Sequence, residues 1–433
     1  MLKKWICIFL AVALLTAAFS GCRAQSSSPA AQNATGTPTE KAPDGTEVNT
    51  TAPAPESAEG QIPVIAQPDA APLGFTAFDS NLIAYLRENG LEDENFSVSP
   101  LSFKAALALA AEGAEGETLN QLLAVLGFSS KTELEAWYQT VLTGVDDFAG
   151  YFNSEWMTGK SDAAYRVVNS IWKNDSLPGE FKPEYVNAVR EALRAETGSA
   201  PAADLTKTVN DWVNEQTNGL IPNLLGNVAD CDVILVNALY LKSGWLDPFM
   251  KKGTDDFTTF DGQVVKKEYM EITERFPYYK DDECQLVSIP LEGGVSMVFV
   301  LGKADNLPQK LGQASDVRVH VTVPTFDLET SFENRELVSF LRSLGCSKMF
   351  SGSAEFGNLY TNGLCVDDIV QKTKVHIYEE GLEAAAATGM TMKNTALPNA
   401  DVIQEFTADH AFSFCIVQGT ENPELLFWGQ IVK

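Results

Sequence analysis

The chain has 433 residues, 45% of them hydrophobic, and a formal net charge of −27 at pH 7. A chain of this length can bury one large core or two ordinary ones. The acidic balance argues against a nucleic-acid-binding protein, because phosphate binding needs clustered Lys and Arg. It would also repel anionic lipid, so membrane association would require a dedicated anchor.

The first residues have the pattern of a secretory signal. Lys3 and Lys4 precede an apolar run from Trp5 to Leu15, and small residues then lead to Cys22. The run is shorter than the ~20 apolar residues of a membrane-spanning helix. Its Ser-Gly-Cys ending resembles the lipobox of bacterial lipoproteins, apart from Phe19 in the place of the usual Leu, and this resemblance implies that Cys22 is lipidated.

We therefore expect residues 1–21 to be a lipoprotein signal peptide that leaves the protein anchored by lipid to the bacterial cell membrane or surface. A plain signal for secretion into the extracellular medium is the alternative. Residues 22–72 are rich in Ala, Thr, Pro and Ser with few large apolar residues, which predicts a disordered tether. The folded body is expected over residues 73–433.

Within this body, apolar periodicity predicts helices first and strands later. Helices are expected over residues 75–89, 102–112, 117–126, 131–147, 183–195, 206–217 and 333–344. Strands are expected over residues 233–241, 257–260, 286–290, 295–301, 317–324, 365–379, 412–417 and 425–432. Because helices and strands do not alternate regularly, the sequence predicts an α+β fold.

Catalytic and metal-binding patterns are weak. Apart from Cys7 and Cys22, the cysteines are widely spaced and form no CxxC pair: Cys231, Cys284, Cys346, Cys365 and Cys415. The three histidines, His320, His376 and His410, belong to no catalytic motif, and two of them lie in strand patterns. We expect buried structural cysteines, no metal, no cofactor and no enzymatic activity.

The most informative segment is Glu379-Glu380-Gly381-Leu382-Glu383-Ala384-Ala385-Ala386-Ala387-Thr388. Alanine propensity favours a short helix. With period 2, however, Leu382, Ala384, Ala386 and Thr388 share one face, which is typical of a strand of small residues after a flexible glycine. A segment that reads both as a mobile loop and as a latent strand indicates a conformational switch.

Several motifs, in a fixed order, together resemble the serpin family. They are N-x-x-x-S-P-x-S at 95–102, Asn169-Ser170-Ile171-Trp172, VNDWVNEQTNGLIPNLL at 209–225, LVNALYLKSGW at 235–245, and the closing segments 406–412 and 426–429. The resemblance covers nearly all of the expected body. It implies helices packed around a large central mixed β-sheet with smaller sheets and an exposed reactive-centre loop at about 379–405.

In this family the cut reactive loop inserts into the central sheet and traps a protease as an acyl-enzyme. The resemblance makes residues 379–388 the hinge of that loop, and its small side chains favour an inhibitor. It also assigns shutter and breach roles to Asn95, Ser99, Ser102, Asn237, Trp245 and Gln371. Two residues depart from the pattern, since Leu382 replaces a Ser or Thr and Gln371 replaces a His.

The usual hinge-to-bond distance places the reactive bond at Thr395–Ala396, with Met392 or Lys393 as alternatives. Small residues there suit elastase-like or subtilisin-like serine proteases, and papain-like cysteine proteases are further candidates. We expect a monomeric serine-type endopeptidase inhibitor. The alternative is a non-inhibitory surface binding protein on the same fold, and inhibition with loop insertion separates the two.

Overall fold

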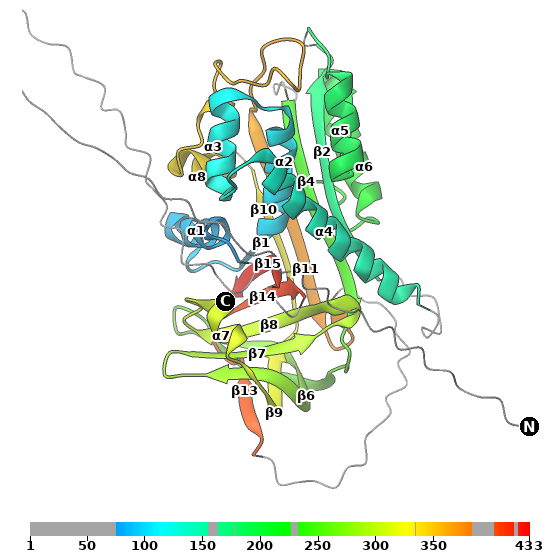
Figure 1. Ribbon diagram of the computed structural model, residues 1–433. Helices are drawn as coiled ribbons and strands as arrows, with labels where there is room; N and C mark the ends of the chain where they lie inside the picture. The colour runs from blue at the N-terminus through cyan, green and yellow to red at the C-terminus, as the bar shows by residue number, and fades with distance from the viewer. Residues whose placement is uncertain are drawn as a thin grey trace, which may run out of the picture. The chain divides into compact units, whose positions relative to one another are not determined.

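The computed structural model describes residues 75–154, 163–176, 178–226, 233–333, 335–382, 402–419 and 423–433 (Figure 1). The expected signal peptide, Cys22, the tether, Cys231, Glu383, the four alanines, Thr388 and both residues of the reactive bond lie outside these ranges, as do Met392 and Lys393.

The helices are α1 (Ala77–Leu86), α2 (Pro100–Gly113), α3 (Gly116–Leu126), α4 (Lys131–Phe152), α5 (Pro183–Leu193), α6 (Ala202–Gln216), α7 (Leu307–Gly312) and α8 (Glu336–Ser343). Local chemistry fixes several ends. Thr76 and Asp79 form a reciprocal capping box at the start of α1. Ser99 caps α2 with Pro100 in its first turn, and Gly127 ends α3 with a positive φ of 80°.

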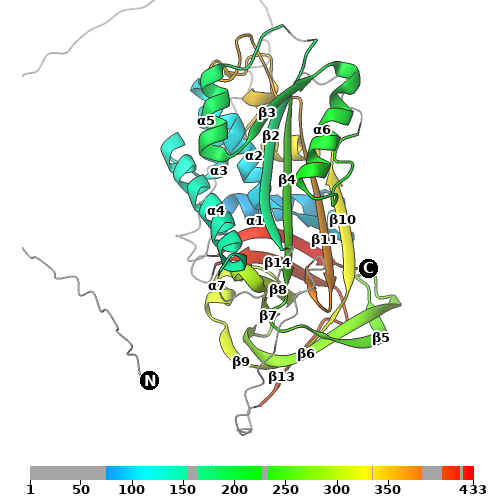
Figure 2. The ribbon, with the colours of Figure 1, turned by 90° about the vertical axis from the view of Figure 1, so that its right-hand side faces the viewer.

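A six-stranded sheet has the order β10-β11-β12-β4-β2-β3. Its strands are β2 (Ala164–Asn174), β3 (Glu196–Ala200), β4 (Val233–Gly244), β10 (Phe326–Phe332), β11 (Asp368–Tyr378) and β12 (Gly381–Leu382). Alternate residues of β4 enter different core clusters: Val233 and Leu235 pack with α2, whereas Ile234, Val236 and Ala238 pack with α6. Helices therefore cover both faces of this sheet, as Figure 2 shows for α4 and α6.

A nine-stranded sheet has the order β1-β15-β14-β8-β7-β6-β9-β13, and β5 also pairs with β6. Its strands are β1 (Phe96–Val98), β5 (Met250–Thr258), β6 (Val264–Lys280), β7 (Cys284–Pro290), β8 (Val295–Gly302), β9 (Ser315–Pro324), β13 (Gln404–Thr407), β14 (Phe412–Gln418) and β15 (Glu424–Ile431). A second apolar cluster joins this sheet to the lower end of the six-stranded sheet in the view of Figure 1.

The α+β expectation is confirmed, and the expected helices all exist with boundaries shifted by a few residues. The expected strand at 257–260 was wrong in its bounds: β5 begins at Met250, and Phe260 lies beyond its end. The expected strand at 365–379 begins only at Asp368. Strands β1, β3, β6 and β10 and helix α7 were not expected. Cys284, Cys346 and Cys415 are buried, as predicted, and burial raises the pKa of the Cys346 thiol to about 12.

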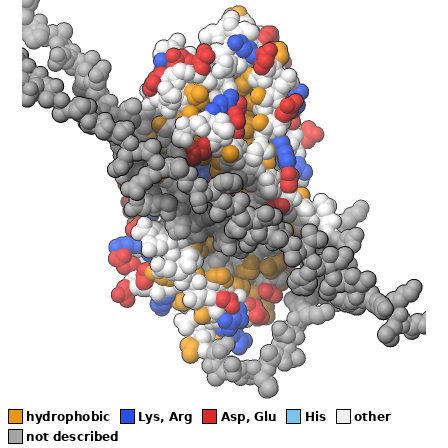
Figure 3. All heavy atoms as spheres, in the orientation of Figure 1, with side chains coloured by type: hydrophobic (Ala, Val, Ile, Leu, Met, Phe, Trp, Pro, Cys, Tyr) orange, Lys and Arg blue, Asp and Glu red, His pale blue; other side chains and the backbone are white. Residues whose placement is uncertain are grey.

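No described helix is long and apolar enough to cross a bilayer. The described residues also include no group of three or more His, Cys, Asp or Glu placed to hold a metal ion. On the face shown in Figure 3, Lys and Arg side chains are scattered among Asp and Glu.

One buried ion cluster ties α1, α2 and β15 together. Lys104 is 1% exposed, and its Nζ lies 3.1 Å from Asp79 Oδ1, 2.9 Å from Glu424 Oε1 and 5.3 Å from the centroid of the Trp137 ring. Burial acts to lower the pKa of Lys104, but the two carboxylates outweigh it and hold the pKa above its usual value. The ammonium group is therefore charged and pairs with two acidic side chains, the buried Asp79 and the partly buried Glu424.

We predict that Lys104→Met lowers the free energy of unfolding by about 3–5 kcal/mol, because it leaves the buried Asp79 carboxylate and the partly buried Glu424 carboxylate without their cation. Chemical denaturation measures the loss. Lys207→Met is the matched control, since Lys207 pairs with Asp211 on the exposed surface of α6 and should contribute little. Equal losses in the two variants would contradict the assignment of stability to the buried cluster.

Candidate functional site

The six-stranded sheet is incompletely paired at its centre. β4 and β11 run parallel and form ladder pairs only from Ile234–Asp368 to Asn237–Gln371. Beyond these four pairs, residues 238–242 of β4 and 372–376 of β11, all of them described, have no ladder pairs with each other. Each strand keeps a paired outer edge, β4 with β2 and β11 with β10. The two facing inner edges are therefore open to one more strand.

β12 begins such a strand. Gly381 pairs with Gly244 of β4 and with Tyr378 of β11, and Leu382 pairs with Ser243 and Ile377. Both pairings are antiparallel, so the chain turns back at Glu379 and Glu380 and enters between the two parallel strands. The first two residues after the hinge glutamates thus already belong to the sheet.

Only glycine fits at position 381. Its φ is +152°, and a Cβ there would collide with the Ser243 carbonyl oxygen and lie 2.7 Å from Gly244 Cα. The side chain that follows is large: Leu382 is 2% exposed and packs in the second apolar cluster together with Leu241, Trp245 and Ile377. Leu382 thus replaces the usual small polar residue with a buried apolar one, which favours keeping this end of the hinge in the sheet.

Trp245 holds the turn that leads into β12. Its indole Nε1 donates a hydrogen bond to the Tyr378 carbonyl over 2.9 Å, and its backbone N–H donates to the Glu380 carbonyl over 3.1 Å. The Phe249 N–H donates to the Glu379 carbonyl over 2.9 Å. The backbone of both hinge glutamates is therefore fixed by the segment that directly follows β4.

Glu292, which no sequence motif singled out, lies beside this point. A Cβ on Gly244 would be 3.2 Å from Glu292 Oε2, and the Ser243 hydroxyl donates to the Glu292 carbonyl over 2.9 Å. Among the described residues, Glu292 Oε2 has no hydrogen-bond partner, and burial raises the pKa of this carboxyl group. A side chain at position 244 would therefore have to displace the Glu292 carboxylate by a few tenths of an ångström.

A buried polar network occupies the place where β4 and β11 part, and we call it the fork network: Ser99, Ser102, Asn169, Asn237, Gln371 and Tyr138. The Gln371 amide accepts from the Ser99 N–H over 3.0 Å and donates to the Ser99 carbonyl over 2.9 Å. It also donates to Asn237 Oδ1 over 3.3 Å. Gln371 thereby joins β11 both to β4 and to the start of α2.

The network continues across β4 to β2 and α4. The Ser102 hydroxyl donates to Asn237 Oδ1, Asn237 Nδ2 donates to Asn169 Oδ1 over 3.2 Å, and Asn169 Nδ2 donates to the Tyr138 hydroxyl over 3.0 Å. Burial raises the pKa of Tyr138 to about 12. Every member is therefore neutral at physiological pH, and the junction carries no charge that ordinary pH changes would alter.

The sequence-predicted residues thus fall in three places. Ser99, Ser102, Asn237 and Gln371 meet at the fork, and Trp245 lies at the opposite end of β4 with the hinge. Asn95 belongs to neither: its amide donates to the Lys433 carbonyl over 2.9 Å and accepts from the N–H groups of Val432 and Lys433. Asn95 therefore links the start of β1 with the C-terminus of the chain. Tyr138 gave no sequence signal, because helix periodicity does not show which helix covers β2.

We predict that Gln371→His makes stability depend on pH. Position 371 is 1% exposed, so the introduced imidazole should have a folded-state pKa below its unfolded value of about 6.5. The folded state then binds fewer protons than the unfolded state, and stability should fall as the pH drops below about 6.5. Melting temperatures from pH 5 to 8, compared with the parent, measure the difference.

The control is Gln313→His, which places an imidazole on the exposed end of α7. This variant should follow the parent curve. A Gln371→His variant that also follows the parent curve would contradict a tightly enclosed, neutral fork.

The comparisons with known proteins agree with this geometry. The family model described as Serpin (serine protease inhibitor) matches residues 74–433. The "Leukocyte elastase inhibitor" of Bos taurus is 31% identical over 372 residues, which cover 78% of this chain and 92% of the relative. An "Uncharacterized serpin-like protein" of Thermococcus kodakarensis is 27% identical, covering 82% and 85%.

Solved structures show the same fold. The insect Serpin48 of Tenebrio molitor has a TM-score of 0.65 and 26% identity, with 82% of this chain and 96% of that one covered. A structure titled as a tumour suppressing serpin has a TM-score of 0.70 and 18% identity, covering 84% and 99%. Family proteins are generally protease inhibitors and not enzymes. This chain, with its partly filled central sheet, is a member of the serpin family.

Proposed function

We propose that this protein is a suicide inhibitor of serine-type endopeptidases. The observation that carries the proposal is the position of β12, which pairs with both β4 and β11 directly beside the stretch where those strands leave each other unpaired. A strand that continues from Leu382 would run into that opening. Backbone N–H and C=O groups on both open edges would then gain partners, and this favours insertion.

The register of β12 specifies the residues that such a strand would meet. If the pairing continues unchanged, residues 383–387 lie opposite 242–238 of β4 and 376–372 of β11. Ala384 then lies opposite Leu241 and Val375, and Ala386 opposite Leu239 and Thr373. Leu239, Leu241 and Val375 belong to the same apolar cluster as Leu382. The small side chains at 384 and 386 would therefore enter a core that leaves little room.

In the same register Thr388 arrives opposite Asn237 and Gln371, where the fork network begins. The four alanines and Glu383 would thus fill the open stretch without breaking a ladder pair, and insertion beyond them must separate Gln371 from Asn237. The open stretch and the alanine run have matching lengths, which supports the assignment of residues 379–388 as the hinge.

The proposed trap follows from this insertion. The protease serine oxygen bonds to the carbonyl carbon of the reactive residue, the peptide C–N bond breaks, and the new amino terminus leaves with a proton. The hinge side of the cut loop then inserts between β4 and β11 and carries the ester-linked protease with it. Inhibition requires that insertion be faster than hydrolysis of the ester, so strain-free passage of small side chains is essential.

For the target we propose elastase-like or subtilisin-like serine proteases, with papain-like cysteine proteases as a second class. The bond at Thr395–Ala396 offers small residues on both sides, and relatives in cattle and mouse are named leukocyte elastase inhibitors. Met392 or Lys393 would instead direct the loop to chymotrypsin-like or trypsin-like pockets. We further propose a bacterial lipoprotein anchored through Cys22 on the outer side of the membrane, on the strength of the signal pattern alone.

We predict that the protein forms a complex with an elastase-like or subtilisin-like protease that survives boiling in SDS. The complex should resolve on a gel as a band near the sum of the two chains, and mass spectrometry of the released C-terminal peptide should identify the bond. Clean cleavage by every protease class tested, with no complex and no rise in melting temperature, would contradict the proposal.

We also predict that Ala386→Glu converts the inhibitor into a substrate, because the carboxylate would enter the apolar cluster beside Leu239 during insertion. Ala385→Glu is the matched control: in the same register it lies beside Lys374, which is partly exposed. The moles of inhibitor consumed per mole of protease trapped should rise more than about tenfold for Ala386→Glu. They should change little for Ala385→Glu, and equal effects would contradict the inferred inward face.

A further inference from the structure

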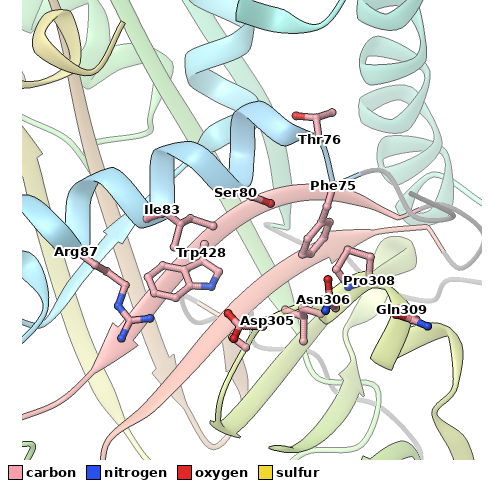
Figure 4. A pocket seen from close by; sticks show the side chains of 13 residues that line it. Phe75, Thr76, Ser80, Ile83, Arg87, Asp305, Asn306, Pro308, Gln309 and Trp428 are labelled. Carbon is pink, nitrogen blue, oxygen red and sulfur yellow. The ribbon is translucent and has the colours of Figure 1, made fainter. Parts of the chain in front are cut away.

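A pocket of about 640 Å³ lies between α1, the start of α7 and β15, and none of the residues that line it belongs to β12 or to the fork network (Figure 4). Helix α1 contributes Ile83, and Arg87 follows its last residue. The first turn of α7 contributes Pro308, and Phe75 and Trp428 supply aromatic walls. Figure 4 shows Arg87 and Trp428 toward one end and Phe75 and Pro308 toward the other. Sites that bind a small molecule or a peptide segment commonly have this size and a mostly apolar lining.

Two polar groups of the pocket have no partners in the described part of the protein. The Arg87 guanidinium makes no ion pair or hydrogen bond there, and the indole nitrogen of Trp428 makes no hydrogen bond. A half-buried guanidinium beside an aromatic ring is suited to an acidic group joined to an apolar body. The pocket therefore fits a segment that carries both apolar side chains and a carboxylate.

The chain itself supplies a segment of that chemistry at the edge of the pocket. Phe75 and Thr76 line the pocket, so the residues immediately before them start at its rim. Residues 62–73, Ile-Pro-Val-Ile-Ala-Gln-Pro-Asp-Ala-Ala-Pro-Leu, hold Ile62, Val64, Ile65 and Leu73, whereas residues 23–61 hold only Val48 among large aliphatic or aromatic residues. The one charged residue of this linker segment is Asp69, and it is acidic.

We propose that the linker segment, residues 62–73, binds in this pocket, with its Ile and Val side chains against Trp428 and Phe75 and Asp69 paired with Arg87. Covalent attachment assists the contact, because a short connection to Phe75 gives an effective concentration on the order of millimolar. Even a weak intrinsic affinity then suffices for high occupancy. The consequence is that the linker would leave the body at the pocket, and only the residues before 62 would separate the body from its proposed anchor.

Hydrogen exchange of the full chain, read by mass spectrometry, tests the proposal. Peptides that cover 62–66, α1 and the α7 loop should exchange about tenfold more slowly in the parent than in the triple variant Ile62→Ser/Val64→Ser/Ile65→Ser. Val48→Ser is the matched control within the polar part of the linker and should behave as the parent. The proposal would be overturned if the amides of residues 62–66 exchanged in the parent as fast as in an unfolded chain. It would also be overturned if α1 exchanged at the same rate in the parent and in the triple variant.

A second measurement tests whether the pocket binds the linker segment or a ligand from outside the chain. A synthetic peptide of residues 61–74 should bind the triple variant and restore the protection of α1. Arg87→Glu in the same background should weaken that binding about tenfold, whereas Arg190→Glu, the same charge change on the exposed face of α5, should not. The fluorescent probe 8-anilinonaphthalene-1-sulfonate should bind the triple variant and be displaced by the peptide. Equal binding of the probe to parent and triple variant, insensitive to the peptide, would show a pocket open to foreign ligands and overturn the proposal.

Neither experiment depends on protease inhibition. The triple variant should trap protease as the parent does, since the pocket is lined by residues outside β12 and the fork network. Failure of the inhibitory function and failure of the linker contact are therefore distinguishable.

Discussion

The structure depends on one unusual constraint: the two central strands of the six-stranded sheet are held together at one end and kept apart along the rest. Gln371 and Asn237 close the ladder between β11 and β4, and the buried Leu382 and the Gly381 turn occupy the other end. Between them two strand edges face each other without ladder pairs. Open edges inside a sheet are costly, and such a state persists only where the surroundings enforce it.

The enforcing contacts are distributed over much of the body. The fork network draws on α2, α4, β2, β4 and β11, so separation of the two strands is coupled to the packing of helices α2 and α4. Beside β12, Trp245 fixes the backbone of Glu380, while Gly381 allows the two chains to approach where no side chain would fit. Small changes at these positions should shift the balance between the open and the filled sheet, since both ends of the opening are defined by few residues.

Much of the fold could be read from the sequence where local chemistry decides it. Ser99-Pro100 and Gly127 are local signals of helix ends, and α2 begins and α3 ends at them. The apolar runs of β8, β14 and β15 were predicted as strands. β6 was not predicted because runs of polar residues, Lys266-Lys267-Glu268 and Thr273-Glu274-Arg275, interrupt the alternation that indicates a strand. β10 was not predicted as a separate strand, because only Thr325 separates it from β9.

Part of the candidate functional site could also be predicted, because some of its residues carry local sequence signals. Gly381 and the small residues after it are local signals, and the polar residues near Ser99 were identified through a family resemblance. Tyr138 and Glu292 carried no signal, because their roles come from the packing of α4 and of the turn before β8 against β2 and β4. The proposed register, in which Thr388 would lie opposite the fork after insertion, rests on the observed pairing of Gly381 and Leu382, which sequence periodicity alone does not give.

The central claim is that residues after Leu382 become a strand between β4 and β11 once the loop is cut. A crystal structure of the protein after proteolysis near Thr395 tests it most directly. We expect residues 383–391 to be paired antiparallel with both strands, with Ala384 and Ala386 facing Leu241 and Leu239 and with Gln371 no longer bonded to Asn237. A cleaved protein whose β4 and β11 keep their present pairing, with the cut loop outside the sheet, would contradict the account.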